Sequence, residues 1–204
     1  MGFYQRRIVP WLTDLSMRQK QLLPFRQQAV SAAEGRVLEI GCGSGLNLPL
    51  YGGAVSSVIA LEPSAELLRM ARPRASAAAV PVTLLDASAE AIPLEAASVD
   101  TVVSTWSFCS IPDISRALAE MRRVLKPGGA LLFVEHGRAP EAGVARWQDR
   151  LDPLWSHIAG GCHLNRQMDD LLIQAGFRID TLKNPRLPGP PTHTFLYQGR
   201  ARPA

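Results

Sequence analysis

The 204-residue chain has few cysteines and no long apolar run, and both shortages exclude classes of protein. Its three cysteines, Cys42, Cys109 and Cys162, are an odd number without a CxxC pair. This pattern argues against a disulfide scaffold and favours reduced thiols in the cytoplasm. The longest apolar stretches fall short of the roughly 18 residues of a membrane-spanning helix. Pro10 and Asp14 interrupt the first apolar stretch, so we expect no signal peptide.

A strong charge of either sign is also absent. The chain carries 22 Lys and Arg against 18 Asp and Glu, for a net charge of +4. The basic residues are interleaved with acids and form no run of about five like charges. This dispersed charge does not indicate nucleic acid as a partner. The length favours a single domain over residues 1–204.

What the chain does contain is an alternation of strand and helix patterns. Helical spacing of apolar residues predicts helices over 64–72, 113–125 and 165–175, with two or three short helices before residue 35. Short apolar runs that stop at glycine, proline or polar residues predict strands over 36–40, 57–61, 80–85, 99–104, 130–134, 177–182 and 194–198. The fold class is therefore α/β, with a mostly parallel sheet that is covered on both faces.

The turn after the first predicted strand, VLEIGCGSGLN, is the place to look for a ligand, because α/β sheets bind at the carboxyl ends of their strands. Its glycines are Gly41, Gly43 and Gly45, and Leu46 replaces the last glycine of a dinucleotide fingerprint. Glu39 precedes them and would repel a diphosphate. The loop therefore suits a ligand with an ammonium and a carboxylate. A tight strand-to-helix turn without a ligand is the alternative.

Glu62 ends the second predicted strand, about 20 residues after the glycine loop. An acid at this position can accept hydrogen bonds from both hydroxyls of a ribose. An ordinary exposed glutamate at a strand end is the alternative reading. Together with the glycine loop, this spacing favours the ribose.

Four segments in this order resemble the motifs of class I S-adenosylmethionine-dependent methyltransferases: VLEIGCGSGLN, ALEPS, DASAEAIPLEAASVDTVVS and EMRRVLKPGGALLFVEH. The resemblance covers roughly residues 36–136. It implies a Rossmann-like sheet of seven strands with an antiparallel last strand, and S-adenosylmethionine as the cofactor. The cofactor-binding residues that it implies are Tyr4, Glu39, Gly41, Gly43, Gly45, Asn47, Glu62, Pro63, Ser88, Ala89 and Thr105. Ser88 replaces the acid or amide that usually faces adenine, and Asp86 is a weaker substitute.

A narrower resemblance involves the ends of the chain. FYQRRIVPWLTDL, STWSFCSIPD, RWQDRLDPLW and GGCHLNR are similar to segments of small bacterial methyltransferases and of the methyltransferase-like 7 group, whose members methylate thiols. This implies a thiol as the methyl acceptor, in a chain that we expect to lack the membrane anchor of that group. Residues 1–34 would form an N-terminal lid, 35–136 the cofactor-binding core, 137–165 a cap inserted after the fifth strand, and 166–204 the last helix and two strands.

Other functions stay open at this point. The acceptor is alternatively an amine, a quinone-precursor carbon or a phospholipid head group, with Phe3, Trp11 and Leu12 in peripheral contact with a membrane surface. Outside this class, the same sheet serves nicotinamide oxidoreductases and non-catalytic cofactor-binding proteins. We expect a monomer or a homodimer.

Candidate catalytic residues follow the fourth and fifth predicted strands. Trp106 and His136 stand at strand ends, and we interpret His136 as a general base or as a group that positions the acceptor. Asp152 and His163 of the cap are further candidates. The pair Cys162 and His163 lacks enough spaced partners to ligate a metal, so we expect no metal site.

Overall fold

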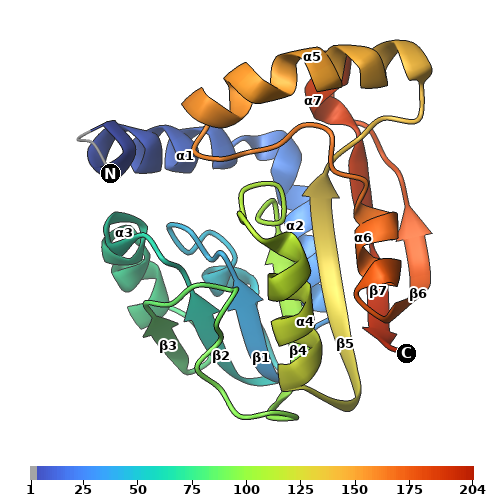
Figure 1. Cartoon of the computed structure of the whole chain (residues 1–204). Helices are drawn as coiled ribbons and strands as arrows, with labels where there is room; N and C mark the ends of the chain where they lie inside the picture. The colour runs from blue at the N-terminus through green and yellow to red at the C-terminus, as the bar shows by residue number, and fades with distance from the viewer. Residues whose placement is uncertain (1–3) are drawn as a thin grey trace.

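The computed structural model describes residues 4–204, which form a twisted seven-stranded sheet with helices on both faces (Figure 1). The strand order is β3-β2-β1-β4-β5-β7-β6, and β7 runs antiparallel to both of its neighbours. This confirms the predicted fold class and the antiparallel last strand. The strands are β1 (Gly35–Ile40), β2 (Val55–Leu61), β3 (Val82–Leu85), β4 (Val99–Thr105), β5 (Leu125–His136), β6 (Phe177–Lys183) and β7 (Leu196–Pro203).

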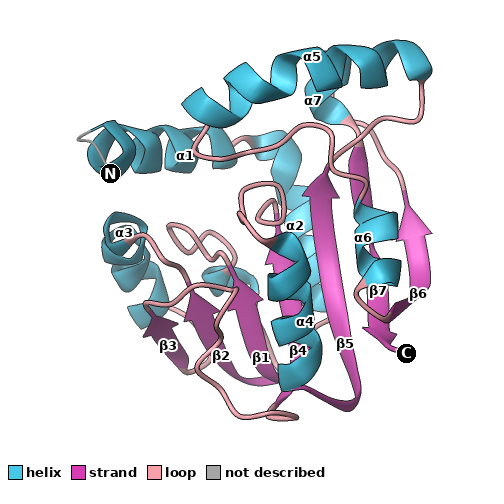
Figure 2. Ribbon diagram, in the orientation of Figure 1, coloured by secondary structure: helices cyan, strands magenta, loops and turns pink. Residues whose placement is uncertain are grey.

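The helices alternate with the strands as the sequence pattern predicts (Figure 2). Ser64 caps α3 by accepting a hydrogen bond from the Leu67 amide, and Asp113 caps α4 in the same way through the Arg116 amide. The helices are α1 (Val9–Met17), α2 (Leu23–Ser31), α3 (Ala65–Ser76), α4 (Ile114–Val124), α5 (Ala142–Ile158), α6 (Met168–Gln174) and α7 (Pro191–Thr194), preceded by a π-helical segment at Tyr4–Ile8.

Two apolar layers hold the helices to the sheet. Because side chains alternate along a strand, Leu38 of β1 packs with α4 and α6 on one face, whereas Val37 packs with α2 and α3 on the other. Both side chains are fully buried. The two layers hold the strands in place, and the carboxyl ends of β1, β2 and β4 point toward the side of the molecule where α1 and α5 lie (Figure 1).

Two expectations about the C-terminal half need correction. The predicted strand 194–198 begins later, at Leu196, because the prolines at 190 and 191 start a helical turn that includes Thr194. The strand predicted over 130–134 is longer, because Leu125 already pairs with Val99. These two differences move the boundaries and leave the topology unchanged.

The segment predicted as a cap, 137–165, contains the 17-residue helix α5. The fully buried Gln148 anchors it: its Oε1 accepts from the Ala139 amide, and its Nε2 donates to the carbonyl oxygens of Gly137 and Leu164. Within residues 4–204, α5 and the other helices are too short or too polar to cross a membrane.

Candidate active site

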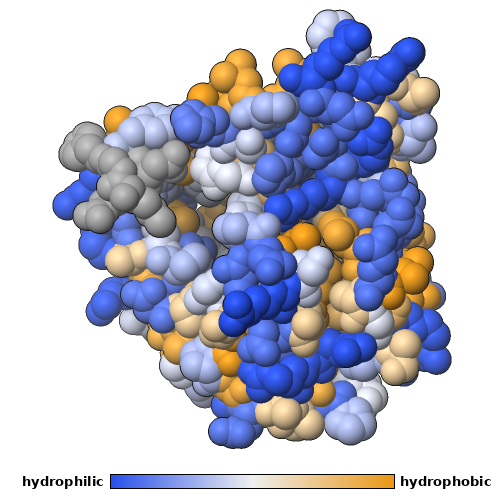
Figure 3. All heavy atoms as spheres, viewed as in Figure 1, coloured by the Kyte–Doolittle hydropathy of each residue, from blue (hydrophilic) through white to orange (hydrophobic). Residues whose placement is uncertain are grey.

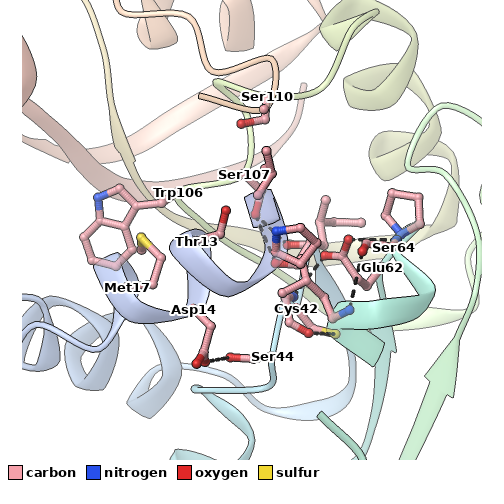
Figure 4. A pocket seen from close by; sticks show the side chains of 18 of the residues that line it. Thr13, Asp14, Met17, Cys42, Ser44, Glu62, Ser64, Trp106, Ser107 and Ser110 are labelled. Atoms are coloured by element: carbon pink, nitrogen blue, oxygen red, sulfur yellow. Dashed lines mark hydrogen bonds between the residues drawn. The ribbon is translucent and has the colours of Figure 1, made fainter. Parts of the chain in front are cut away.

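A cavity of about 790 Å³ lies at the carboxyl ends of β1, β2 and β4 (Figure 4). The glycine loop after β1 and the start of α3 form one side of it. The loop after β4 forms another, and α1 together with the residues after α5 covers it. The π-helical segment before α1 contacts the last residue of α5, because the Tyr4 hydroxyl donates to the Ile158 carbonyl oxygen at 3.1 Å.

Each glycine of the loop has a backbone conformation that other residues rarely adopt, with φ of +61° at Gly41, +55° at Gly43 and +81° at Gly45. A Cβ atom on Gly41 would lie 2.4 Å from the Ser107 Oγ, and one on Gly45 would lie 2.8 Å from the Leu48 side chain. A Cβ atom on Gly43 would meet no atom of residues 4–204 within 4 Å. Gly41 and Gly45 are therefore needed for packing, whereas Gly43 leaves room beside the cavity.

Glu62 faces the cavity and holds the glycine loop at the same time (Figure 4). Its Oε2 accepts a hydrogen bond from the Gly43 amide and its Oε1 accepts one from the Ser64 amide, both at 3.0 Å. Burial raises the pKa of this carboxyl above its ordinary value, and the two amides oppose the rise. Each oxygen retains a lone pair that can accept from a hydroxyl of a ligand.

A buried polar network beneath the cavity involves Arg26 of α2. Its guanidinium donates to Asn47 Oδ1 at 2.9 Å and to Thr105 Oγ1 at 3.3 Å, and it lies 4.9 Å from the centre of the Trp106 ring. Asn47 in turn donates to Glu39 Oε1 at 3.0 Å. Burial raises the pKa of Glu39 to about 7, against the opposing effects of Tyr51, Arg26 and Asn47.

Trp106 begins the loop after β4 with a φ of +53°, which is strained for a bulky residue. Such strain is typical of functional sites, and Trp106 lines the cavity. The fully buried Glu135 of β5 supports the same loop, because its carboxylate accepts hydrogen bonds from the amides of Ser107 and Phe108. Burial raises the pKa of Glu135 to about 7.

Most of the predicted cofactor residues come together at this cavity. Four of them are outside its lining. Gly45 belongs to the glycine loop, Glu39 and Asn47 lie next to the loop, and Tyr4 joins the segment before α1 to the end of α5. The predicted residues that line it are Gly41, Gly43, Glu62, Pro63, Ser88, Ala89, Thr105 and Trp106. Asp86, the weaker substitute for Ser88, is exposed and outside the lining.

The other predicted catalytic residues lie next to the cavity and outside its lining. His136 Nε2 is 3.1 Å from Cys162 Sγ. His163 Nδ1 is 2.8 Å from Asp152 Oδ2, and the other oxygen of Asp152 accepts from the Leu164 amide. These contacts give His136, Asp152 and His163 partners within the protein. The role of His136 as a general base or as a group that positions the acceptor stays a prediction.

The sequence patterns did not identify Asp14 and Arg26, which are among the few buried charged side chains. Asp14 stands four residues after the buried Pro10, and Arg26 stands three and four residues before the buried Ala29 and Val30. A charged residue at the helical spacing of buried positions is the signal that would have identified both.

Comparison with known proteins places this site in a family. Residues 38–133 match the family model described as a methyltransferase domain. The chain is 36% identical to rat thiol S-methyltransferase TMT1B over 137 residues, which are 66% of this chain and 56% of that protein. It is 32% identical to human TMT1A over 180 residues, which are 86% of this chain and 73% of that protein. The chain thus spans about half to three quarters of the length of these relatives.

A phosphatidylethanolamine N-methyltransferase of Cereibacter sphaeroides is 34% identical over 149 residues, which are 68% of this chain and 73% of that protein. Among solved structures, a Thermotoga maritima protein titled as a S-adenosylmethionine-dependent methyltransferase and possible histamine N-methyltransferase superposes with a TM-score of 0.68 at 26% identity, over 98% of both chains.

The residues of the cavity fit the cofactor of this family, S-adenosylmethionine. The Glu62 carboxylate can accept from ribose hydroxyls, and Leu67, Ala89 and Ile111 offer apolar contact for adenine. The open space at Gly43 lets a ligand approach the loop backbone. A cavity of about 790 Å³ is also within the usual size of cofactor sites. The chain belongs to the class I S-adenosylmethionine-dependent methyltransferases.

Proposed function

We propose that this methyltransferase acts on the thiol of a small molecule. The match to human TMT1A along 86% of the chain carries this proposal, because it extends well beyond the cofactor core of residues 35–136. The chemistry of the cavity supports it. The acids that line the cavity are Asp14, Glu62 and Glu66. They lie on α1 or beside the glycine loop and α3, away from the wall formed by the loop after β4.

The opposite wall is formed by the loop after β4 and the residues after α5. Its lining includes the side chains of Trp106, Ile111, Pro112 and Ala159, and Ser110 adds a hydroxyl. An acceptor with a permanent cationic charge would be poorly solvated at such a wall. An uncharged thiol is compatible with it, and a few per cent of a free thiol is ionised at neutral pH.

In this proposal each predicted cofactor residue contacts or supports one part of S-adenosylmethionine. Glu62 accepts from the ribose hydroxyls, and Ser88 and Ala89 contact adenine beside Pro63. The glycine loop, with Asn47 and Glu39 beneath it, surrounds the methionine part, while Thr105 and Trp106 separate it from the acceptor. Tyr4 holds the segment before α1 against the end of α5. The cofactor supplies an electrophilic methyl group on a sulfonium, and the chain aligns the acceptor with it and excludes water.

Labelled S-adenosylmethionine, offered with panels of small thiols, amines and phenols, tests the choice of acceptor. The expected result is methyl transfer to thiols with a stoichiometric yield of S-adenosylhomocysteine. Turnover of amines or phenols without turnover of any thiol would contradict the thiol proposal and leave the family assignment intact.

A second candidate function is methylation of a phospholipid head group. Nine of the exposed large apolar side chains belong to the covering segments: Tyr4, Ile8, Trp11, Leu12 and Leu15 near the N-terminus, and Trp147, Leu151, Leu154 and Ile158 of α5. Apolar residues are visible along the upper edge of the molecule in Figure 3. Phe3, which sequence analysis added to this contact, lies outside the described residues.

Arginines accompany these apolar side chains. Arg7, Arg18, Arg146 and Arg150 are exposed on the same segments, and the Arg150 guanidinium lies 5.4 Å from the centre of the Trp147 ring. Apolar side chains next to arginines are typical of helices that lie on anionic membranes. Sedimentation with vesicles of phosphatidylethanolamine and phosphatidylglycerol, together with analysis of methylated lipids, tests this candidate. Binding without lipid methylation would leave the thiol as the acceptor.

A further inference from the structure

Three metal-ligating side chains converge behind the wall of the cavity. Cys109 follows β4, His136 is the last residue of β5, and Cys162 follows α5. Each offers one ligand atom, and all three atoms lie within 4.8 Å of one another. His136 Nε2 and Cys162 Sγ are 3.1 Å apart. Sequence analysis found too few partners for Cys162, and the fold supplies Cys109 and His136 from segments that are distant in the sequence.

The ligand chemistry and the spacing both match zinc. In a tetrahedral site with Zn–S near 2.3 Å and Zn–N near 2.0–2.1 Å, the ligand atoms stand roughly 3.5–3.8 Å apart. The cluster reaches this spacing when the contact between His136 and Cys162 opens by about 0.5 Å and any pair of ligand atoms at the 4.8 Å limit closes by about 1 Å. Two thiolates and an imidazole select a borderline-soft cation. We propose that Cys109, His136 and Cys162 bind one Zn²⁺ ion, which leaves the fourth position to water.

The surroundings are compatible with a metal. Cys109 is only 3% exposed, whereas His136 and Cys162 are half-buried, so an ion has a path to the site. Binding releases the two thiol protons and transfers no electron. A Zn²⁺ ion with two thiolates and a neutral imidazole carries no net charge. The nearby Arg166, which donates to the Phe108 carbonyl oxygen, is therefore not repelled.

The ion would tie the residues after α5 to the loop after β4. These segments already touch, because the His163 amide donates to the Cys109 carbonyl oxygen at 2.8 Å. Both segments also line the cavity, through Ser110 and Gly160. Zinc at this point would fix the wall that we assign to the acceptor, without itself belonging to the lining of the cavity.

The test uses the full chain, purified under reducing conditions, stripped with a chelator and titrated with Zn²⁺ in competition with a chromophoric chelator. We expect one Zn²⁺ per chain. Co²⁺ in its place should give a thiolate-to-metal charge-transfer band and the intense visible bands of a tetrahedral site. His136→Ala and Cys162→Ser should each weaken Zn²⁺ binding by at least about 100-fold.

Matched controls are His157→Ala, which removes an exposed histidine of α5, and Cys42→Ser, which removes the third cysteine. Both should keep one Zn²⁺ per chain. The proposal is overturned if the wild-type chain shows no thiolate-to-Co²⁺ band, or if folded His136→Ala and Cys162→Ser variants bind Zn²⁺ as the wild type does. Because the Co²⁺ spectrum needs no variant, the result does not depend on whether the variants fold.

Discussion

Asp14 of α1 and Ser44 of the glycine loop are joined by a hydrogen bond of 2.5 Å, from the serine hydroxyl to the aspartate Oδ1 (Figure 4). The other oxygen of Asp14 pairs with Arg18 at 2.5 Å. Helix α1 therefore buries an aspartate and exposes Trp11 and Leu15, which is the reverse of an ordinary surface helix. The polar contact with the loop, together with the buried Pro10, holds α1 over the cofactor cavity.

Replacing Asp14 with alanine should consequently weaken cofactor binding. The variant leaves the Ser44 hydroxyl without its partner and detaches α1 from the glycine loop. A lost buried hydrogen bond of this kind costs about 1–3 kcal/mol. Calorimetric titration with S-adenosylhomocysteine measures the effect. Ser16→Ala, which changes an exposed serine of the same helix that bonds only to Thr13, is the control. Equal affinities in both variants would mean that α1 does not cover the bound cofactor.

Glu62→Ala should weaken cofactor affinity by roughly 1.5–3 kcal/mol for each charge-assisted hydrogen bond to the ribose. Part of the loss arises because the amides of Gly43 and Ser64 lose their acceptor. To separate the two contributions, 2′-deoxy and 3′-deoxy analogues of S-adenosylhomocysteine are titrated into the wild type and the variant. The exposed Glu95→Ala provides the control. The ribose assignment fails if the deoxy analogues bind the wild type as tightly as the parent compound.

The glycine loop offers a matched pair of substitutions. Gly43→Ala and Gly45→Ala both place a Cβ at positive φ, at a cost of roughly 1–2 kcal/mol. Only Gly45→Ala also pushes a Cβ against Leu48 and Ala71. This overpacking should lower its free energy of unfolding by about 1–3 kcal/mol more than that of Gly43→Ala. Chemical denaturation measures both. Gly43→Ala should mainly weaken cofactor binding, and equal unfolding free energies would contradict the packing argument.

The sequence predicted the cofactor core closely and the covering segments poorly, for a physical reason. Buried strand residues such as Val37 and Leu38 stand in short apolar runs. Such runs and the capping residues of helices can be recognised within a few consecutive positions, so the strands and helix starts of the core could be predicted. The burial of Asp14 and Arg26, and the meeting of Cys109 with Cys162, depend on contacts between distant segments. No local pattern encodes such contacts, which is why α5 was expected only as an undivided cap.

The raised pKa of Glu39 makes stability depend on pH. Burial gives the folded carboxyl a pKa of about 7, against an ordinary value of 4.5, so the folded state binds more protons between these values. The stability that this group contributes is fully present below pH 4.5 and is lost as pH rises through 7, by about 3 kcal/mol. The free energy of unfolding of the wild type, measured relative to that of Glu39→Gln, should therefore decline between pH 5 and 8.

S-adenosylhomocysteine provides a second measurement on the same pair of proteins. If its ammonium lies near Glu39, as the proposed binding mode requires, the charge favours the ionised carboxylate and lowers its pKa. The decline in relative stability should then be smaller with ligand present. Binding should also release a proton at about pH 6, between the ordinary pKa of 4.5 and the pKa of about 7 in the ligand-free protein. Calorimetry in buffers of different ionisation enthalpy detects that proton. A decline of the same size with and without the ligand would place the ammonium away from Glu39.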